Sequence, residues 1–103
     1  RYVEDTQILE PEAFSALVKA YHKAKKKNLT VCTLLQIQTE SQDYEQIGKV
    51  LMKNLRQTDY MGTMGDGKMY VLLANTVRVE ADIVISRFAE AGIESKIVER
   101  IEE

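Results

Sequence analysis

The stretch GTMGDGKM, residues 62–69, contains residue types that could bind a nucleotide phosphate. It fits the P-loop pattern G-x-x-x-x-G-K-[ST] except at its last position, where Met69 replaces the hydroxyl that would hold magnesium. A thioether is a soft ligand and suits a hard cation poorly. A working P-loop also leads into a helix, whose N-terminus binds the phosphates, whereas the apolar run MYVLL that follows here indicates a strand. We therefore exclude a P-loop nucleotide site.

The elements that would position this loop can be predicted from apolar spacing, which indicates three helices. The first helix follows Pro11, whose missing N–H costs nothing in a first turn. The second helix has its apolar stripe over residues 44–55 and starts at Asp43. The third helix is predicted over residues 77–91, with Thr76 as its N-cap.

Strand patterns lie between and after these helices. The run LTVCTLLQIQ, residues 29–38, is apolar on both faces and indicates a central strand. Two further strands flank the turn at residues 65–67, because Asp-Gly between β-rich runs favours a hairpin. Residues 93–101 alternate and predict a last strand. The order helix, then β-α-β-β-α-β, predicts an α+β fold of the ferredoxin-like type, with an antiparallel sheet, helices on one face and an extra N-terminal helix.

Length and charge limit the classes of function. The chain has 103 residues, enough for one domain, and its formal charge of −2 argues against a general affinity for nucleic acid or for anionic membranes. Its single cysteine, Cys32, excludes an internal disulfide and favours the cytoplasm. No apolar run is long enough to span a membrane. Because the chain begins at Arg1, we expect one domain of a longer chain that could carry a membrane anchor.

The residues before and within the hairpin resemble the GGDEF family of diguanylate cyclases. In that family a helix ends in Leu-Arg-x-x-Asp, and five residues later a hairpin carries Gly-Gly-[Asp/Glu]-Glu-Phe before an apolar strand. Here LRQTDYMGTMGDGKMYVLL, residues 55–73, keeps that order and spacing, with Gly-Asp-Gly-Lys-Met at the signature. The resemblance extends over nearly the whole chain and implies the same β-α-β-β-α-β core.

The resemblance also implies which chemistry has been lost. Active members join two GTP molecules into cyclic di-GMP, with divalent metal held by acidic residues on the first strand and in the signature. The corresponding positions are Gln36 and Gly67, and the acidic fourth position of the signature is Lys68. A neutral amide and a glycine offer no anionic oxygen to a hard cation. We expect no cyclase activity, no metal site and no cofactor.

A second site of the family is retained. Arg56-Gln57-Thr58-Asp59 matches the RxxD motif, at which many members bind cyclic di-GMP as an allosteric ligand, and Arg87 matches an assisting arginine on the following helix. Arg56 can offer a planar fork of donors to guanine or phosphate, and Asp59 can accept from guanine N1–H and N2–H₂. Arg87 could meet a phosphate or stack on a base. Alternatively, Arg56 and Asp59 form a local ion pair of little energetic value.

These residues lead to three functional hypotheses. The first is an inactive GGDEF-like domain that binds cyclic di-GMP through Arg56, Asp59 and Arg87 and relays its level to an attached sensor or effector module, or to a partner. Regulators of Pel exopolysaccharide synthesis combine an inactive GGDEF domain with a working RxxD site in this way. The second is a nucleotide-independent module for homodimerisation or partner docking. The third is a degenerate GTP-binding domain that regulates an attached phosphodiesterase.

Overall fold

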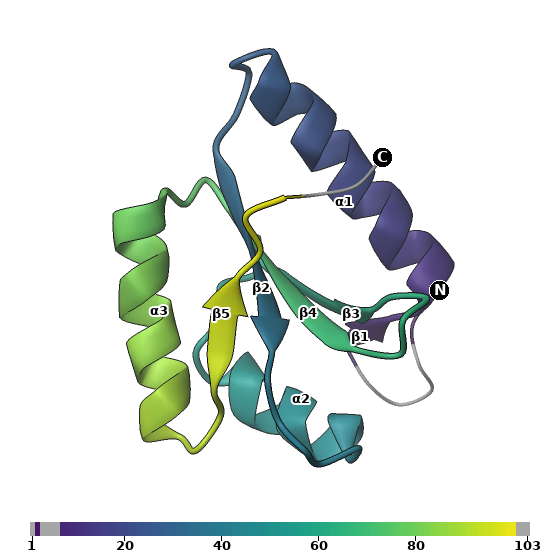
Figure 1. Cartoon of the computed structure of the whole chain (residues 1–103), viewed down its shortest axis with the longest axis vertical. Coiled ribbons are helices and arrows are strands. Elements are labelled where there is room, and N and C mark those ends of the chain that lie inside the picture. Colours follow the sequence, from purple (N-terminus) through teal and green to yellow (C-terminus); the bar gives the residue numbers. More distant parts are fainter. Residues whose placement is uncertain (1, 3–6, 101–103) are drawn as a thin grey trace.

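The computed structural model describes residue 2 and residues 7–100, which form an α+β fold of three helices and one mixed sheet (Figure 1). In chain order the elements are β1 (Ile8–Leu9), α1 (Pro11–Lys26), β2 (Cys32–Ile37), α2 (Tyr44–Met52), β3 (Tyr60–Thr63), β4 (Met69–Ala74), α3 (Arg78–Glu90) and β5 (Ser95–Ile97).

The five strands lie in the order β1-β3-β4-β2-β5. The middle strand, β4, pairs antiparallel with β3 and β2, and β5 pairs antiparallel with β2. β1 pairs parallel with β3, so the prediction of a wholly antiparallel sheet was wrong. A strand of two residues is too short to show an alternating pattern, which explains why it was not predicted. From Pro11 onward, the predicted order of helices and strands is present.

The two faces of the sheet are covered by different helices. Phe14 of α1 lies in one apolar cluster with Leu34 and Leu72. Leu51 of α2 and Phe88 of α3 lie in a second cluster on the opposite face. The two helices predicted for the β-α-β-β-α-β core, α2 and α3, thus share one face, and the additional N-terminal helix α1 covers the other. Because β2 and β4 are apolar on both faces, each face has to be covered, and Figure 1 shows α1 and α3 on opposite sides of these strands.

Close packing of α1 on β3 requires glycine at one position. A Cβ atom at Gly62 would lie 2.3 Å from the ring of Phe14, closer than two carbon atoms can approach. The Phe14 ring also stacks on Tyr70 of β4, with ring centres 6.5 Å apart. These contacts fix α1 over the hairpin that β3 and β4 form.

The hairpin and the start of α2 confirm two local predictions. Gly67 has φ +77° and its N–H donates to the carbonyl of Met64, as a glycine in the hairpin turn should. Asp43 is the N-cap of α2, and its carboxylate accepts from the Gln46 N–H at 3.1 Å. The turn chemistry at both sites could be predicted from local sequence alone.

Four predicted elements have different boundaries in the structure. The central strand predicted over residues 29–38 is β2, which spans Cys32–Ile37. α2 ends at Met52, so the turn that holds the RxxD motif lies beyond the helix instead of in its last turn. α3 begins at Arg78 with Val77 as its N-cap, and Glu80 Oε1 accepts from the Val77 N–H in place of the predicted cap by Thr76. β5 has three residues where a strand over 93–101 was predicted, and residue 101 lies outside the described part of the chain.

Candidate functional site

The RxxD residues form a closed turn between α2 and β3. The Arg56 N–H donates to Asp59 Oδ2 at 2.9 Å, and the Asp59 N–H donates back to the Arg56 carbonyl at 3.0 Å. These two bonds pair both the backbone N–H and the backbone carbonyl of Arg56 and so close the turn. Asp59 therefore caps this segment before it binds anything else.

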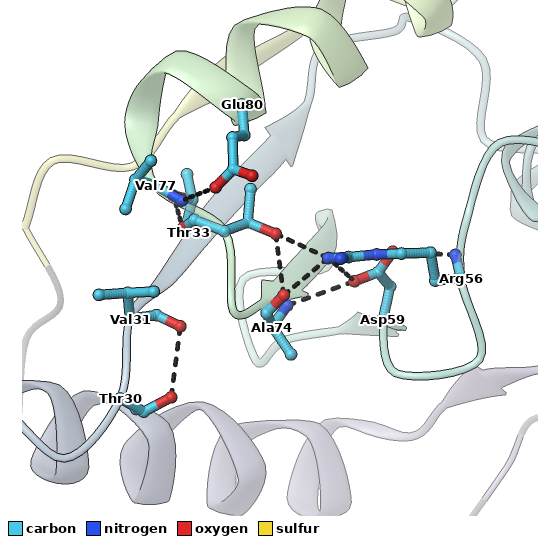
Figure 2. Close-up of polar contacts among 9 residues, drawn as sticks. Thr30, Val31, Thr33, Arg56, Asp59, Ala74, Val77 and Glu80 are labelled. Atoms are coloured by element: carbon cyan, nitrogen blue, oxygen red, sulfur yellow. Dashed lines mark hydrogen bonds and ion pairs between the residues drawn. The ribbon is translucent and has the colours of Figure 1, made fainter.

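The guanidinium of Arg56 ties this turn to the end of β4 (Figure 2). Its Nε donates to Asp59 Oδ2 at 3.3 Å, and its Nη2 donates to Asp59 Oδ1 at 3.1 Å. The same Nη2 reaches the Ala74 carbonyl and Thr76 Oγ1, both at 2.7 Å. Asp59 Oδ1 also accepts from the Ala74 N–H at 3.3 Å. The motif is thus more than a local ion pair, because it joins two segments of the chain.

The two charged groups differ in exposure. The Asp59 side chain is 3% exposed, whereas that of Arg56 is 56% exposed. The hydrogen bond and the negative charge of Asp59 both raise the pKa of Arg56, so its guanidinium is always charged. Within the described part of the chain, Arg56 Nη1 makes no hydrogen bond. An anchored cation with one open donor edge is the group best placed to meet a ligand.

Thr76 has a role that sequence reasoning missed. Its hydroxyl accepts from Arg56 and donates to the Ala74 carbonyl at 2.8 Å, while its own carbonyl accepts from Thr33 Oγ1 at 2.9 Å. Because the hydroxyl is occupied in this way, it does not cap α3. A Thr directly before a helix is usually read as an N-cap, and nothing in the local sequence marks this one as a partner of an arginine 20 residues earlier.

A cavity of about 310 Å³ opens beside this turn. Arg56, Gln57 and Asp59 supply its polar wall. Its remaining wall is mainly apolar and aromatic and is formed by Tyr2, Gln7, Leu9, Met52, Leu55, Tyr60 and Met61. A cation and an aromatic ring beside an apolar wall form a suitable site for a planar, electron-rich base.

Arg87 lies apart from this cavity. It is exposed in the last turn of α3, nine residues beyond Arg78, which corresponds to about 13.5 Å along the helix axis. Arg56, in contrast, bonds to Thr76 just before α3 begins. Among the described residues, no hydrogen bond or ion pair joins Arg87 to Arg56 or Asp59. The structure brings together two of the three predicted site residues.

The residues predicted to stand at the cyclase positions, Gln36, Gly67 and Lys68, contact other parts of the hairpin region. Gln36 Nε2 donates to the Tyr70 hydroxyl at 3.3 Å, and that hydroxyl donates to Asp66 Oδ2. Burial, followed by the hydrogen bond and negative charge of Asp66, raises the pKa of Tyr70 to about 12. Gly67 forms the turn, and its carbonyl accepts from the Tyr44 hydroxyl at 2.7 Å. Lys68 is exposed and donates its N–H to Asp66 Oδ1.

In residue 2 and residues 7–100, no three His, Cys, Asp or Glu side chains are grouped so that they could hold a metal ion. Over the same residues, no helix is both long and apolar enough to cross a membrane.

The fold is similar to that of diguanylate cyclase domains, as the sequence resemblance predicted. One solved structure of this kind is the diguanylate cyclase SiaD of Pseudomonas aeruginosa in complex with its activator SiaC, with a TM-score of 0.71 and 14% identity. The match covers 99% of this chain and 51% of SiaD, so this chain spans about half the length of that protein. A DGC protein from Thermotoga maritima has a TM-score of 0.64 and 20% identity over 90% of this chain and 80% of that one. No family model and no curated protein matches the chain.

Proposed function

We propose that this domain is a non-catalytic receptor for cyclic di-GMP and that Arg56 is its main contact with the ligand. The observation that carries the proposal is the geometry of Arg56, whose guanidinium is held by Asp59, Ala74 and Thr76 while its side chain remains 56% exposed at a cavity. A pre-positioned arginine loses little side-chain entropy when it binds. Its open edge can donate to guanine O6 and N7 or to a phosphate oxygen.

The size of the cavity suits part of the ligand. At about 310 Å³ it lies at the small end of ligand pockets, which range over roughly 300–1,000 Å³. We therefore place one guanine base in it, against Tyr60 and Leu55, with the sugar–phosphate ring outside. The ligand is a compact dianion, so a single well-placed arginine can bind it although the chain is not basic overall.

In this proposal Asp59 acts chiefly through Arg56. Each of its two carboxylate oxygens already accepts two hydrogen bonds, and its side chain is buried. To accept from guanine N1–H and N2–H₂, as the family resemblance implies, it would have to release some of these. We assign it to positioning Arg56. Arg87 would contact the part of the ligand that extends along α3.

The same proposal excludes cyclase activity. Gln36 is bonded to Tyr70, Gly67 has no side chain, and Tyr44 lies against the hairpin turn through its bond to the Gly67 carbonyl. None of these groups supplies an anionic ligand for magnesium. With GTP and either magnesium or manganese, we expect no cyclic di-GMP by chromatography. Formation of product would overturn this part of the proposal.

The wider assignment rests on the sequence resemblance. We propose a ferredoxin-like core with an added N-terminal helix, in a cytoplasmic domain that relays second-messenger level to an attached module or a partner. The Pel-type receptors provide the pattern for this assignment. The order of elements from β2 to β5 and the single, buried Cys32 support it.

The test is calorimetric titration of cyclic di-GMP into the parent chain and into Arg56→Ala. Loss of a charge-assisted contact should weaken binding about ten- to a hundredfold. Arg78→Ala is a matched control, because Arg78 is 64% exposed and paired with Glu99 on the surface. It removes the same charge away from the cavity, so its affinity should stay within about twofold of the parent. Thermal unfolding of each variant separates binding effects from loss of fold.

A second variant tests whether positioning matters. Thr76→Val removes one acceptor of Arg56 Nη2 but leaves its open edge intact. It should weaken binding by a smaller factor than Arg56→Ala, about threefold to tenfold. No binding by the folded parent would overturn the receptor function, and equal losses in Arg56→Ala and Arg78→Ala would overturn the assignment of Arg56 as the main contact.

One observation favours a second candidate, a nucleotide-independent docking module. Arg56 and Asp59 bond to each other and to Ala74 and Thr76 within the chain, so the motif has a structural role without any ligand. A parent chain that binds no cyclic di-GMP but loses stability in Arg56→Ala would support this candidate.

A further inference from the structure

The end of the molecule where α1 finishes carries both lysines and exposed aliphatic side chains. We call it the basic–apolar surface and define it by the last turn of α1 with its cap, the start of β2 and the first turn of α3 (Figure 1). Its exposed residues are Lys23, Lys25, Lys26, Lys27, Leu29, Val31, Val77, Arg78 and Val79. None of these residues belongs to the cavity at Arg56.

The aliphatic residues are concentrated at this end. Of the seven large hydrophobic side chains that are exposed in the described residues, four lie on the basic–apolar surface. Leu29 and Val79 are 75% and 74% exposed, the two highest values among the seven. Single exposed apolar residues are normal on proteins, but a group on one surface marks an interaction site.

Leu29 is exposed on a rigid backbone. Asn28 has φ +58°, its N–H donates to the Lys25 carbonyl, and the Leu29 N–H donates to the Ala24 carbonyl. This is the Schellman pattern at a helix C-terminus, in which the residue at the Leu29 position usually packs back on the helix. Here it projects into solvent although the backbone is ordered. Its exposure is therefore a property of the fold.

Segments that are distant in sequence form one continuous surface. The Asn75 N–H donates to the Val31 carbonyl at 2.9 Å, which joins the start of β2 to the chain just before α3. Val31 and Val77 line the same cavity, about 410 Å³ in volume. Lys25, with its Nζ on the Cys32 carbonyl at 2.9 Å, lines that cavity as well.

Positive charge predominates on this surface. The last turn of α1 is basic, and this stabilises the negative end of the helix dipole as well as setting the local charge. The described acidic groups of the region are Glu99, which pairs with Arg78 at 2.7 Å, Glu80, which accepts from the Val77 N–H, and Asp82, whose negative charge contributes to the raised pKa of Arg78. Since the whole chain has a formal charge of −2, the rest of the molecule is more acidic. An anionic surface would therefore attract the domain with this end foremost.

We propose that the basic–apolar surface docks on an anionic phospholipid bilayer, with Leu29 and Val79 inserted at the interface and the lysines among the headgroups. Peripheral membrane binding needs both apolar insertion and electrostatic attraction, and this surface offers both. Nucleic acid fits it less well. The residues that define the basic–apolar surface include no aromatic ring on which a base could stack. Its exposed aliphatic side chains would make no favourable contact with a phosphate backbone. The inference is independent of cyclic di-GMP binding.

Flotation with lipid vesicles tests the proposal with the chain as it is. We expect binding to vesicles of equal parts phosphatidylglycerol and phosphatidylcholine, little binding to phosphatidylcholine alone, and a decrease as salt screens the lysines. Lys23→Gln with Lys27→Gln should lower partitioning about 25-fold, since each lysine near an anionic surface contributes about fivefold. Leu29→Ser should lower it about tenfold.

Matched variants show whether the location matters. Lys49→Gln with Lys53→Gln makes the same change at the same i, i+4 spacing from the end of α2, and Ile83→Ser removes an exposed apolar residue further along α3. Both should bind vesicles within about twofold of the parent. The proposal is overturned by a folded parent that does not float with anionic vesicles, or by control variants that lose as much binding as Leu29→Ser.

Discussion

Two aspartates stabilise two loops of this domain, and they differ in the partner that each one holds. Asp59 accepts from the Arg56 guanidinium and from the backbone N–H groups of Arg56 and Ala74. Asp66 accepts from the Lys68 N–H and from the Tyr70 hydroxyl. Each carboxylate thus combines backbone capping with one side-chain partner, but one partner is a permanent cation and the other a phenol.

That difference decides which loop can recognise a ligand. Arg56 remains 56% exposed after its bonds to Asp59, Ala74 and Thr76 are made, so a positive charge faces the cavity. Tyr70 is 8% exposed, and its hydroxyl is shared by Gln36 and Asp66. The polar groups of the hairpin satisfy one another, whereas the RxxD turn keeps an open donor edge. The β3–β4 loop is thus the less suited of the two to bind an anion.

The largest expected effect comes from removing each aspartate in turn. Asp59→Ala should lower the free energy of unfolding by about 3 kcal/mol, because it leaves the backbone N–H groups of Arg56 and Ala74 without acceptors and the guanidinium without its counter-charge. Asp66→Ala should lower the free energy of unfolding by only about 1 kcal/mol, because Asp66 lies in an exposed turn. Urea unfolding of both variants measures the difference. Equal costs would mean that the two loops are stabilised alike.

A smaller effect should appear in the pH dependence of the hairpin. The pKa of Tyr70 is raised in the folded state to about 12, above its ordinary value of 10. The folded state therefore holds this proton more tightly than the unfolded state does. Its stabilising contribution is complete below about pH 10 and is lost as pH rises from there through about 12.

Tyr70→Phe isolates that contribution. Urea unfolding across this pH range should show a steeper fall in stability for the parent than for Tyr70→Phe, and phenolate absorbance should show one late-titrating tyrosine fewer in the variant. The comparison is needed because burial also raises the pKa of Tyr21. Identical pH profiles for the two proteins would show that burial and the bond to Asp66 do not raise the pKa of Tyr70 in solution.

Local sequence was a good guide where one short segment determines the structure. The Asp43 cap and the Gly67 hairpin turn are set by residues within three or four positions, and both were predicted. The apolar spacing of the helices also predicted their order along the chain. In each case the relevant interaction is closed within one turn of helix or one hairpin.

The missed features depend on partners far along the chain. Thr76 looks like an N-cap in local sequence, but Arg56 and Thr33 engage it from 20 and 43 residues away. α2 ends at Met52 although its apolar stripe continues to Leu55, and the turn that follows is bonded to Ala74 and Thr76 near the end of β4. The position of Arg87 in the sequence resembles that of the assisting arginine in GGDEF domains. This sequence position does not determine the distance between Arg87 and Arg56 in the folded chain. Such positions follow from tertiary contacts, which a spacing pattern does not contain.

The smallest effect is expected at Arg87, and it tests how far the site extends from the RxxD turn. Arg87→Gln should leave the free energy of unfolding within about 0.5 kcal/mol of the parent, because the side chain is exposed. It should weaken cyclic di-GMP binding by about threefold, through loss of one solvent-screened charge some 13.5 Å along α3. Calorimetric titration of cyclic di-GMP into Arg87→Gln and into Arg56→Ala compares the contributions of the two arginines to affinity. A loss at Arg87 as large as that at Arg56 would move the centre of the site onto α3, and the open edge of Arg56 would then no longer explain recognition.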